Sequence, residues 1–425
     1  MTDRLYYTDS FLHQFEARVV RLDADGGSLA LDRSAFYPAS GGQLSDTGWI
    51  EVPAPNGRQL RLRVKDVAED QQTNDVIHSV EKAEVTLRAG IVVRGVIDAE
   101  RRRDHMQQHS GQHVLSAAFE KLYGFPTVSF HMGDQSSTID LASHCLEATQ
   151  IDDAERLANE IISEDRPVEI RFATADEARS MGVRKIPPGK PEKLRLIDIR
   201  EFDLNACGGT HVRSTGQIGG LLLRKSEKVK QGVRLEFLCG LRAVSAARRD
   251  FQTLTDAASA LSTNLWEVPQ QVRKTQDELR AGQKTQHRLL EEVAELQAER
   301  LLAFAEKGAF SKPNLSTHGG LYEHPARYKL VVHFVPERDL TFIKMLAQKL
   351  TRSAHVVALL GCGGLQPSLV FAQTPGLQHD MGALMKQAVQ RMGTRGGGTG
   401  DMAQGGAPDA GTAQEALRET AKAVG

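Results

Sequence analysis

Short apolar runs that alternate with polar residues mark the first part of the chain. Between residues 1 and 95 they include EARVVRLD, SLALDRSAFYP, LRLRVKDVAE and IVVRGVID, separated by Gly, Asp and Pro. A two-residue alternation bounded by turn residues is typical of half-buried strands. The pattern therefore predicts a small β-barrel over residues 1–95.

The pattern changes from residue 96 onward. Helical spacing begins at Ala99, a strand-like STIDLAS follows, and DDAERLANEIISEDRP has the acidic first turn of a second helix. The runs VEIRFATA, LRLIDI and GGLLLRKSEKVKQGVRLEFLCG are typical of strands around loops. We therefore predict an α+β domain over residues 96–245.

Residues 246–306 are predicted to form a long helix or a helical hairpin. No proline follows Pro269 in this stretch, and Gly282 and Gln286 interrupt its apolar pattern. Two heptad positions are occupied by apolar residues: Leu265, Val272, Leu279 and Val293 on one, and Val268, Leu289 and Leu296 on the other. Packing within the chain and a homodimer contact through residues 250–306 both fit this pattern.

The last part, residues 307–425, alternates strand-like and helix-like segments. KLVVHFV, LTFIKMLAQKLTR, AHVVALLGC and PSLVFAQ precede a glycine-rich run, MGTRGGGTGDMAQGGAPD, and a C-terminal helix. This order predicts a C-terminal α/β domain. The fold class as a whole is multidomain α+β.

Composition narrows the class of protein. The formal net charge is −1, so a nucleic acid would have to be held by local basic patches. We find neither a signal-peptide apolar region nor a run of about 18 apolar residues that a membrane span needs. The four cysteines, Cys145, Cys207, Cys239 and Cys362, have no disulfide-framework spacing. A cytoplasmic protein without a membrane partner is expected.

Three equally spaced histidines lie in RRRDHMQQHSGQHVLSAAF, residues 101–119: His105, His109 and His113. Residues four apart lie on one helix face, an arrangement found in zinc sites. The spacing allows either neighbouring pair. A helical wheel places His113 beside apolar positions and His105 between polar ones, which favours His109 and His113 and leaves His105 as a polar helix residue.

A second pair of metal-binding side chains occurs in LNACGGTHVRSTGQIG, residues 204–219. Cys207 and His211 flank two glycines that let the chain fold tightly. A thiolate and an imidazole are both good zinc ligands. The alternative is a set of histidines without a metal. Ser110 follows His109 where a zincin protease has its catalytic Glu, which disfavours peptide hydrolysis.

These motifs resemble a known family. DHMQQHSGQHVLSAAF and CGGTHVRSTGQIG are similar to the editing domain of alanyl-tRNA synthetase and to the long-form AlaX editing proteins, its free-standing relatives. LDRSAFYPASGGQLSDTG, residues 31–48, resembles the family's glycine-rich motif. RGGGTGDMAQGG, residues 395–406, is similar to the signature of the C-terminal domain shared with DHH phosphoesterases. The resemblance covers residues 5–425.

The resemblance implies hydrolysis of the ester that links a wrong amino acid to alanine tRNA, mainly serine and in some members glycine. A pocket shaped for a methyl group discriminates against such residues by only about 10²-fold, so a second site must remove errors. The implied zinc ligands are His109, His113, Cys207 and His211. Four protein ligands would fill the coordination sphere of the ion, whereas three would leave one position open for catalysis. Both arrangements fit the sequence.

The glycine-rich motif implies a substrate-binding role for Ser34, Gly41, Gly42 and Gln43. The family has Thr at the position of Ser34, Glu at that of Ala39 and Thr at that of Ser110. A hairpin turn without a ligand is the alternative for residues 31–48. The residues expected to contact tRNA are Arg101, Arg102, Arg103, Gly396, Gly397 and Gly398, and a second basic group comprises Arg224, Lys225, Lys228, Lys230 and Arg234.

The function predicted from these motifs is a zinc-dependent trans-editing hydrolase that acts on mischarged alanine tRNA. The alternative is a non-catalytic tRNA-binding protein whose zinc only holds the fold. A DHH phosphoesterase would need an Asp-His-His motif, and Asp104-His105-Met106 does not supply one.

Overall fold

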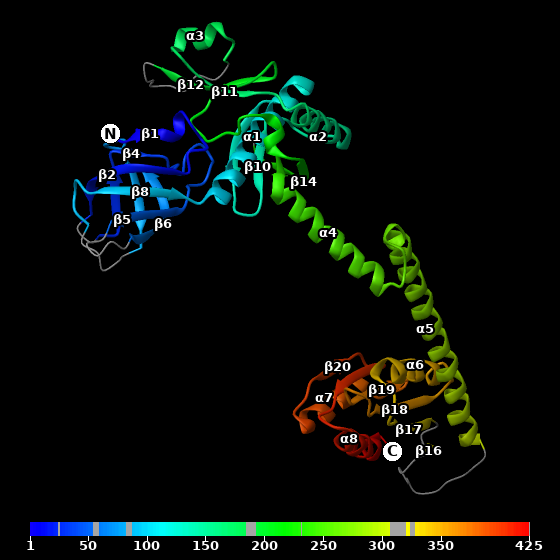
Figure 1. Cartoon of the computed structure of the whole chain (residues 1–425). Coiled ribbons are helices and arrows are strands. Elements are labelled where there is room, and N and C mark those ends of the chain that lie inside the picture. The colour runs from blue at the N-terminus through cyan, green and yellow to red at the C-terminus, as the bar shows by residue number, and fades with distance from the viewer. Residues whose placement is uncertain are drawn as a thin grey trace. The chain divides into compact units, whose positions relative to one another are not determined.

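The computed structural model describes residues 1–23, 26–53, 59–81, 87–183, 193–230, 232–306, 320–323 and 328–424. The chain divides into two compact units, Met1–Ala257 and Ala258–Gly425, and each is described by itself. Figure 1 shows the elements of both units. The architecture is mixed α+β, as predicted.

A closed six-stranded barrel opens the first unit, as the alternating pattern predicted. Its antiparallel strands follow the order β2 (Gln14–Leu22), β3 (Ser28–Leu31), β7 (Val76–Val80), β6 (Gln59–Glu69), β5 (Gly48–Pro53) and β8 (Val92–Ile97). Inward residues of β2 and β8, such as Val19 and Val93, are buried in the barrel core. Strand β7 was not predicted, because its alternation directs a polar residue, His78, inward. Short strands β1 (Asp3–Arg4) and β4 (Arg33–Ser34) pair in parallel, and η1 (Leu5–Tyr7) follows β1.

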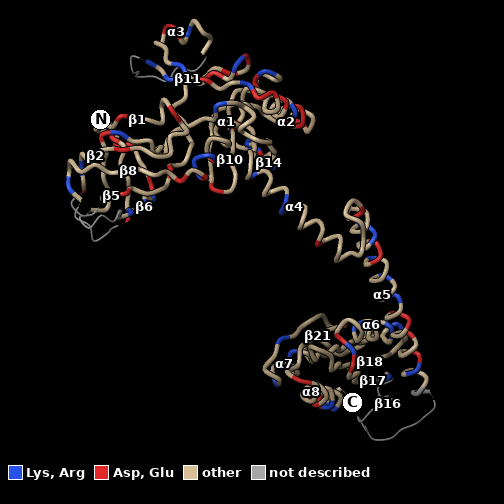
Figure 2. The backbone as a smooth tube through the Cα atoms, in the orientation of Figure 1, with Lys and Arg blue, Asp and Glu red and all other residues tan. Residues whose placement is uncertain are grey.

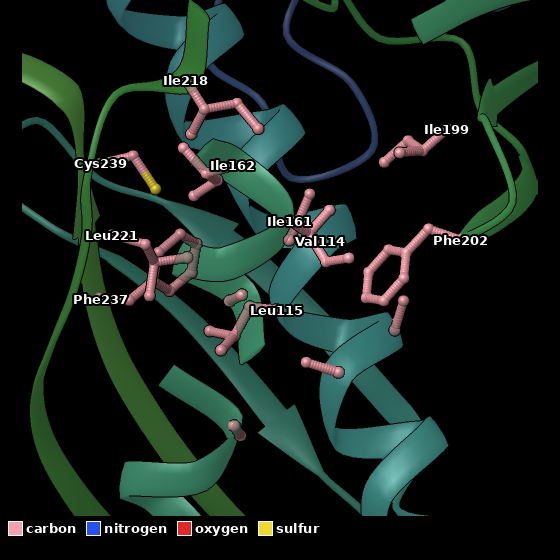
Figure 3. Packing of buried hydrophobic residues seen from close by; sticks show 14 of the residues in the cluster. Val114, Leu115, Ile161, Ile162, Ile199, Phe202, Ile218, Leu221, Phe237 and Cys239 are labelled. Carbon is pink, nitrogen blue, oxygen red and sulfur yellow. The ribbon is translucent and has the colours of Figure 1, made fainter. Parts of the chain in front are cut away.

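Helices α1 (Ala99–Tyr123) and α2 (Ala148–Ser163) pack with the four-stranded sheet β14-β15-β10-β9. The strands are β9 (Thr127–Met132), β10 (Ser137–Leu141), β14 (Leu221–Val229) and β15 (Gly232–Cys239). Figure 3 shows the shared core, in which Leu115 of α1 lies near Ile161 of α2 and Phe237 of β15. Burying a side chain of this size stabilises the fold by about 1.5–3 kcal/mol.

The start and end of α1 follow known capping chemistry. The Asp98 side chain accepts the backbone N–H of Arg101, and Gly124 ends the helix in a left-handed conformation with φ 68°. This fixes the position of the helix that carries the histidines.

A three-stranded sheet completes the first unit. It consists of β11 (Val168–Ala173), β12 (Leu194–Ile199) and β13 (Asp203–Ala206), with α3 (Ala175–Ser180) after β11 and η2 (Thr215–Ile218) beyond β13. The chain leaves β13 directly into residues 207–211, which we call the Cys-His loop. Helix α4 (Gly240–Ala260) follows β15.

The second unit is built on the mixed sheet β16-β17-β18-β19-β21-β20. Its strands are β16 (Gly320–Glu323), β17 (Lys329–Val335), β18 (Val356–Cys362), β19 (Ser368–Gln373), β20 (Gly396–Gly398) and β21 (Met402–Gly406). One buried cluster joins the sheet to α5 (Val268–Glu306) and α6 (Leu340–Leu350); the other joins it to α7 (Met381–Met392) and α8 (Ala410–Val424). Residues 307–319 of the predicted 307–425 domain lie outside the described residues.

The predicted helical segment 246–306 consists of α4 and α5, with η3 (Leu265–Glu267) just before α5. Near its C-terminal end α5 buries Ala294, Ala298 and Leu301 in the cluster shared with α6. Of its heptad residues Val268 is buried, whereas the others on α5 are exposed: Val272, Leu279, Leu289, Val293 and Leu296. Charges of both signs follow the helix in Figure 2. The homodimer stays a prediction. Among the described helices, none has the length and apolar character needed to cross a membrane.

Candidate metal centre

Four potential metal ligands converge in the first unit. Helix α1 supplies His109 and His113, and the Cys-His loop supplies Cys207 and His211. Their ligand atoms all lie within 4.8 Å of one another. The Cys207 Sγ is 3.5 Å from His109 Nε2 and 3.3 Å from His211 Nε2. Three imidazoles and one thiolate match the ligand chemistry of a zinc site, so the residues present fit this ion.

Each of the three imidazoles has a second partner on its other nitrogen. His109 Nδ1 lies 2.7 Å from Gln43 Oε1. His113 Nδ1 lies 3.2 Å from Asp203 Oδ2, and His211 Nδ1 lies 3.1 Å from Ser110 Oγ. When these Nδ1 atoms carry the protons and donate them, each Nε2 keeps a free lone pair toward the cluster. Metal-bound histidines are nearly always oriented in this way.

Gln43 joins the barrel to both halves of the cluster. Besides His109, its Oε1 accepts the backbone N–H of Thr210 at 3.1 Å, while its Nε2 donates to Thr210 Oγ1 at 2.8 Å. The side chain is buried. Both ends of the amide therefore hold the cluster together, and a substrate-binding role for Gln43 stays a prediction.

The other residues of the glycine-rich motif differ in accessibility. Gly41 and Gly42 have left-handed φ values of 58° and 84°. A Cβ on Gly42 would lie 2.3 Å from the Phe130 carbonyl oxygen, whereas a Cβ on Gly41 would meet nothing within 4 Å. Gly41 is exposed and Gly42 half-buried, and for both the substrate-binding role stays a prediction. The Phe130 ring in turn stacks on His109 with centroids 5.3 Å apart.

Ser34 makes its contacts within the protein. The residue is fully buried on β4, and its hydroxyl lies 2.8 Å from His78 Nε2 inside the barrel region. The same oxygen accepts the backbone N–H of Phe36. The hydroxyl is thus engaged within the protein, and a substrate-binding role for Ser34 stays a prediction.

Glycine is required in the Cys-His loop for a steric reason. A Cβ on Gly209 would lie 2.1 Å from His109 Cε1, so the loop passes directly against the α1 imidazole. Gly208 is exposed and next to the Tyr7 hydroxyl. The two glycines thus serve different ends, because only Gly209 lets the two halves of the cluster meet.

The charges in the cluster favour binding of a cation. Burial raises the pKa of the Cys207 thiol, but the neighbouring His109 and His211 outweigh this and bring it well below its ordinary value. Burial lowers the pKa of His113, yet its hydrogen bonds to Asp203 and Cys207 prevail and raise it to about 10. Burial lowers the pKa of His211 to about 3. The imidazoles therefore favour the thiolate form of Cys207, the form that binds a metal.

The helical wheel placed only His109 and His113 on the buried face of α1, but His105 is buried as well. It is 1% exposed, its Nδ1 has no hydrogen-bond partner among the described residues, and burial lowers its pKa to about 3. The flank of α1 around it is covered: Asp104 pairs with Arg242, and Gln108 donates to the Cys239 carbonyl. The prediction was wrong because polar neighbours on a helix can themselves be buried once they find partners.

The three arginines at the start of α1 have different environments. Arg102 is fully buried in an ion pair with Asp46 and donates to the carbonyls of Ser10 and Ala35 at 2.7 and 2.6 Å. The tRNA-binding prediction is therefore wrong for Arg102, whose guanidinium joins α1 to the barrel. Arg101 is half-buried and Arg103 exposed, so for these two residues it stays a prediction.

The second basic group is largely neutralised. Arg224 pairs with Asp250, Lys225 with Glu227, and Arg234 with Asp140. Gly396, Gly397 and Gly398 form strand β20, which pairs with β21. The glycine-rich run is thus a regular hairpin, and its contact with tRNA stays a prediction.

The side chains of Asp203 and Ser110, which orient two of the imidazoles, were not predicted from the sequence. Asp203 stands four residues before Cys207, but Asp198 and Glu201 are also acidic, so the sequence did not single it out. Ser110 differs from the catalytic Glu of a zincin protease and from the Thr of the family, and neither difference predicts its contact with His211. In the structure its Oγ also accepts the Val212 backbone N–H at 3.2 Å and so ties α1 to the Cys-His loop.

Comparison with known proteins places the chain among tRNA-related sequences. The family described as "Threonyl and Alanyl tRNA synthetase second additional domain" matches residues 194–235, and "tRNA synthetases class II (A)" matches residues 8–101. The first match contains Cys207 and His211, whereas the second covers the barrel region and the start of α1.

Individual relatives cover most of the chain. The alanine–tRNA ligase of Pyrococcus abyssi is 30% identical over 99% of this chain, which spans only 43% of that protein's length. The alanyl-tRNA editing protein AlaX-L of Pyrococcus horikoshii is 29% identical over 95% of this chain and 94% of its own length. The alanyl-tRNA editing protein Aarsd1-B of Xenopus laevis is 35% identical over 67% of this chain and 66% of its own.

Proposed function

Because the chain belongs to the family that unites alanyl-tRNA editing proteins of the AlaX type with the matching part of alanine–tRNA ligases, we propose that it is a zinc-dependent trans-editing hydrolase of mischarged alanine tRNA. The proposed substrates are alanine tRNA charged with serine or with glycine. The observation that carries the proposal is the His109, His113, Cys207 and His211 cluster with an anchored Nδ1 on every imidazole.

The reaction is hydrolysis of an ester. Water adds to the carbonyl carbon, the bond to the ribose oxygen breaks, and that oxygen leaves as the free hydroxyl of the tRNA end. A zinc ion held by three of the four residues, with its fourth position open, would polarise the ester carbonyl or lower the pKa of a bound water. The protein's own contribution is to preorganise the site, because Gln43, Asp203 and Ser110 keep the three imidazoles in one tautomer and orientation.

The approach of the substrate is proposed at the Cys-His loop. Cys207 is half-buried and the adjacent Gly208 is exposed, whereas all three histidines of the cluster are buried. The tRNA phosphates are proposed to meet Arg101 and Arg103 at the start of α1, and the backbone of Gly396–Gly398 is a second proposed contact. We place the protein in the cytoplasm, where its substrate is made, and the homodimer is proposed to form through residues 250–306.

A deacylation assay tests the proposal. Alanine tRNA charged with serine, glycine or alanine is incubated with the intact chain, with Cys207→Ala and with Cys145→Ala as the matched control, since Cys145 is an exposed free cysteine outside the cluster. We expect release of serine or glycine but not of alanine, a loss of more than about 100-fold in Cys207→Ala, and no change in Cys145→Ala. Metal analysis of the same samples should find zinc only where Cys207 is intact.

Two outcomes would contradict the proposal. Equal hydrolysis of correctly charged alanyl-tRNA would rule out editing. Binding of tRNA without hydrolysis of any of the three esters would favour the alternative of a tRNA-binding protein with a structural zinc.

A further inference from the structure

Arg195 is a buried guanidinium beneath the Cys-His loop, and the mechanism outlined above does not use it. It is the second residue of β12 and is 7% exposed. Its Nη1 donates to the Cys207 carbonyl at 2.7 Å and to the Gly209 carbonyl at 2.9 Å. Its Nε donates to the Tyr7 carbonyl at 2.9 Å. One side chain thus holds three backbone carbonyls from two distant parts of the chain.

The loop depends on side chains for its shape because it lies outside the helices and strands. Strand pairing ends at Cys207, whose N–H donates to the Arg195 carbonyl at 3.1 Å. Beyond that point the Thr210 N–H donates a hydrogen bond to Gln43 Oε1, and the His211 N–H donates one to Ser10 Oγ. The carbonyls on either side of Gly208 are held by Arg195 alone among the described contacts. A planar guanidinium with rigidly spaced donors fixes two such carbonyls more closely than a flexible ammonium group does.

The position of these carbonyls affects the ligand atoms directly. The Gly209 N–H points to the Cys207 Sγ at 3.4 Å. On its other side Gly209 has no room to move toward His109, whose Cε1 lies where a Cβ would be. A shift of the peptide units around Gly208 would therefore alter both the thiolate direction and the contact between loop and helix.

Burial of Arg195 is not explained by stability alone. Its Nη2 is buried and has no hydrogen-bond partner among the described residues. A buried guanidinium with an unpaired N–H costs the fold free energy, so stability alone does not favour a charge at this place. The contacts with the loop therefore point to a role in the site.

We propose that Arg195 is a positioning residue of the metal centre, which holds the Cys207 and Gly209 carbonyls so that the Cys207 thiolate faces the three imidazoles. This inference rests on the proposed function, because it concerns the same cluster. It adds a residue from outside that cluster which tunes how well a metal is held.

Cobalt binding by the full chain tests the inference. The metal-free protein is titrated with Co²⁺, whose thiolate charge-transfer and visible bands report the ligand geometry independently of any tRNA reaction. The variants are Arg195→Met, Arg195→Lys and Arg171→Met. Arg171 lies on the neighbouring strand β11, is exposed and pairs with Asp198, so it serves as the matched control.

We expect the affinity of Arg195→Met for Co²⁺ to fall by about 10- to 100-fold, with a weakened charge-transfer band. Arg195→Lys should be intermediate, and Arg171→Met should match the unchanged protein. If Arg195→Met fails to fold, as judged by its circular dichroism, Arg195→Lys decides the question. Unchanged affinity and spectrum in a folded Arg195 variant would overturn the positioning role while leaving the proposed function intact. Absence of Co²⁺ binding to the unchanged protein would overturn the metal site itself, and the role of Arg195 with it.

Discussion

Helices α1 and α5 are both long, but α1 buries many polar side chains whereas α5 exposes many apolar ones. Helix α1 buries an arginine, three histidines and two glutamines, whereas α5 exposes Leu279, Leu289 and Leu296. The difference lies in partners. Nearly every buried polar group of α1 has a hydrogen-bond partner, such as Asp46 for Arg102 and Gln43 for His109. Among the described residues, no apolar surface covers the exposed leucines of α5. Burial therefore follows the partners that the fold supplies, and not hydrophobicity alone.

The largest effect is expected for Arg102→Met on α1. Removing one partner of a buried ion pair leaves Asp46 uncompensated and should lower the free energy of unfolding of the first unit by about 3–5 kcal/mol. Urea denaturation followed by circular dichroism measures it. The neighbouring exposed variant Arg103→Met should stay within about 0.5 kcal/mol of the unchanged protein. Similar values for both would show that α1 does not depend on its buried partner.

A smaller effect is expected for Gln43→Leu, which removes the partner of His109 Nδ1. We predict that affinity for Zn²⁺ falls by about 10- to 100-fold, measured by competition with a chromogenic chelator. Gln112→Leu is the matched control, because Gln112 is a half-buried α1 residue whose side chain bonds Ser116. Equal affinities in the two variants would mean that the bond to Gln43 does not tune the site.

The buried His105 should make the free energy of unfolding depend on pH. Its pKa is lowered from 6.5 to about 3 by burial, so it takes up a proton on unfolding, and stability is lost as the pH falls below 6.5. Between pH 7.5 and pH 5 the unchanged protein should lose about 2 kcal/mol more than His105→Leu does. Parallel urea titrations at the two pH values measure the difference. Identical pH dependence in both proteins would refute the assignment.

The smallest effect on the fold is expected for Leu279→Lys on α5. The side chain is 61% exposed, so the free energy of unfolding should change by less than about 0.5 kcal/mol. The same substitution at the fully buried Ala294 should be far more damaging. If residues 250–306 form the predicted homodimer, sedimentation should show Leu279→Lys shifted toward monomer. A monomeric unchanged protein would contradict the dimer.

Much of the architecture could be predicted from periodicity, because alternating and helical patterns report directly which face is buried. The barrel was recovered this way, apart from β7 with its inward His78. The four clustered residues were selected by their spacing and by the family resemblance. Arg102 was misassigned because its partner Asp46 comes from a distant part of the sequence. His105 is buried because its neighbours Asp104 and Gln108 pair with Arg242 and Cys239, which also lie far along the chain. Spacing along one segment contains no information about such partners.

The bond from Gln43 to His109 and Thr210 has an evolutionary consequence. The barrel contributes a residue to a centre whose ligands all lie elsewhere in the chain. Recombination that exchanged the barrel for an unrelated one would leave every ligand in place and yet loosen the imidazole that Gln43 orients. The barrel region and the segments that carry the ligands are therefore expected to be inherited as one module. A copy of α1 and the Cys-His loop grafted into another protein would lack the residue that orients His109.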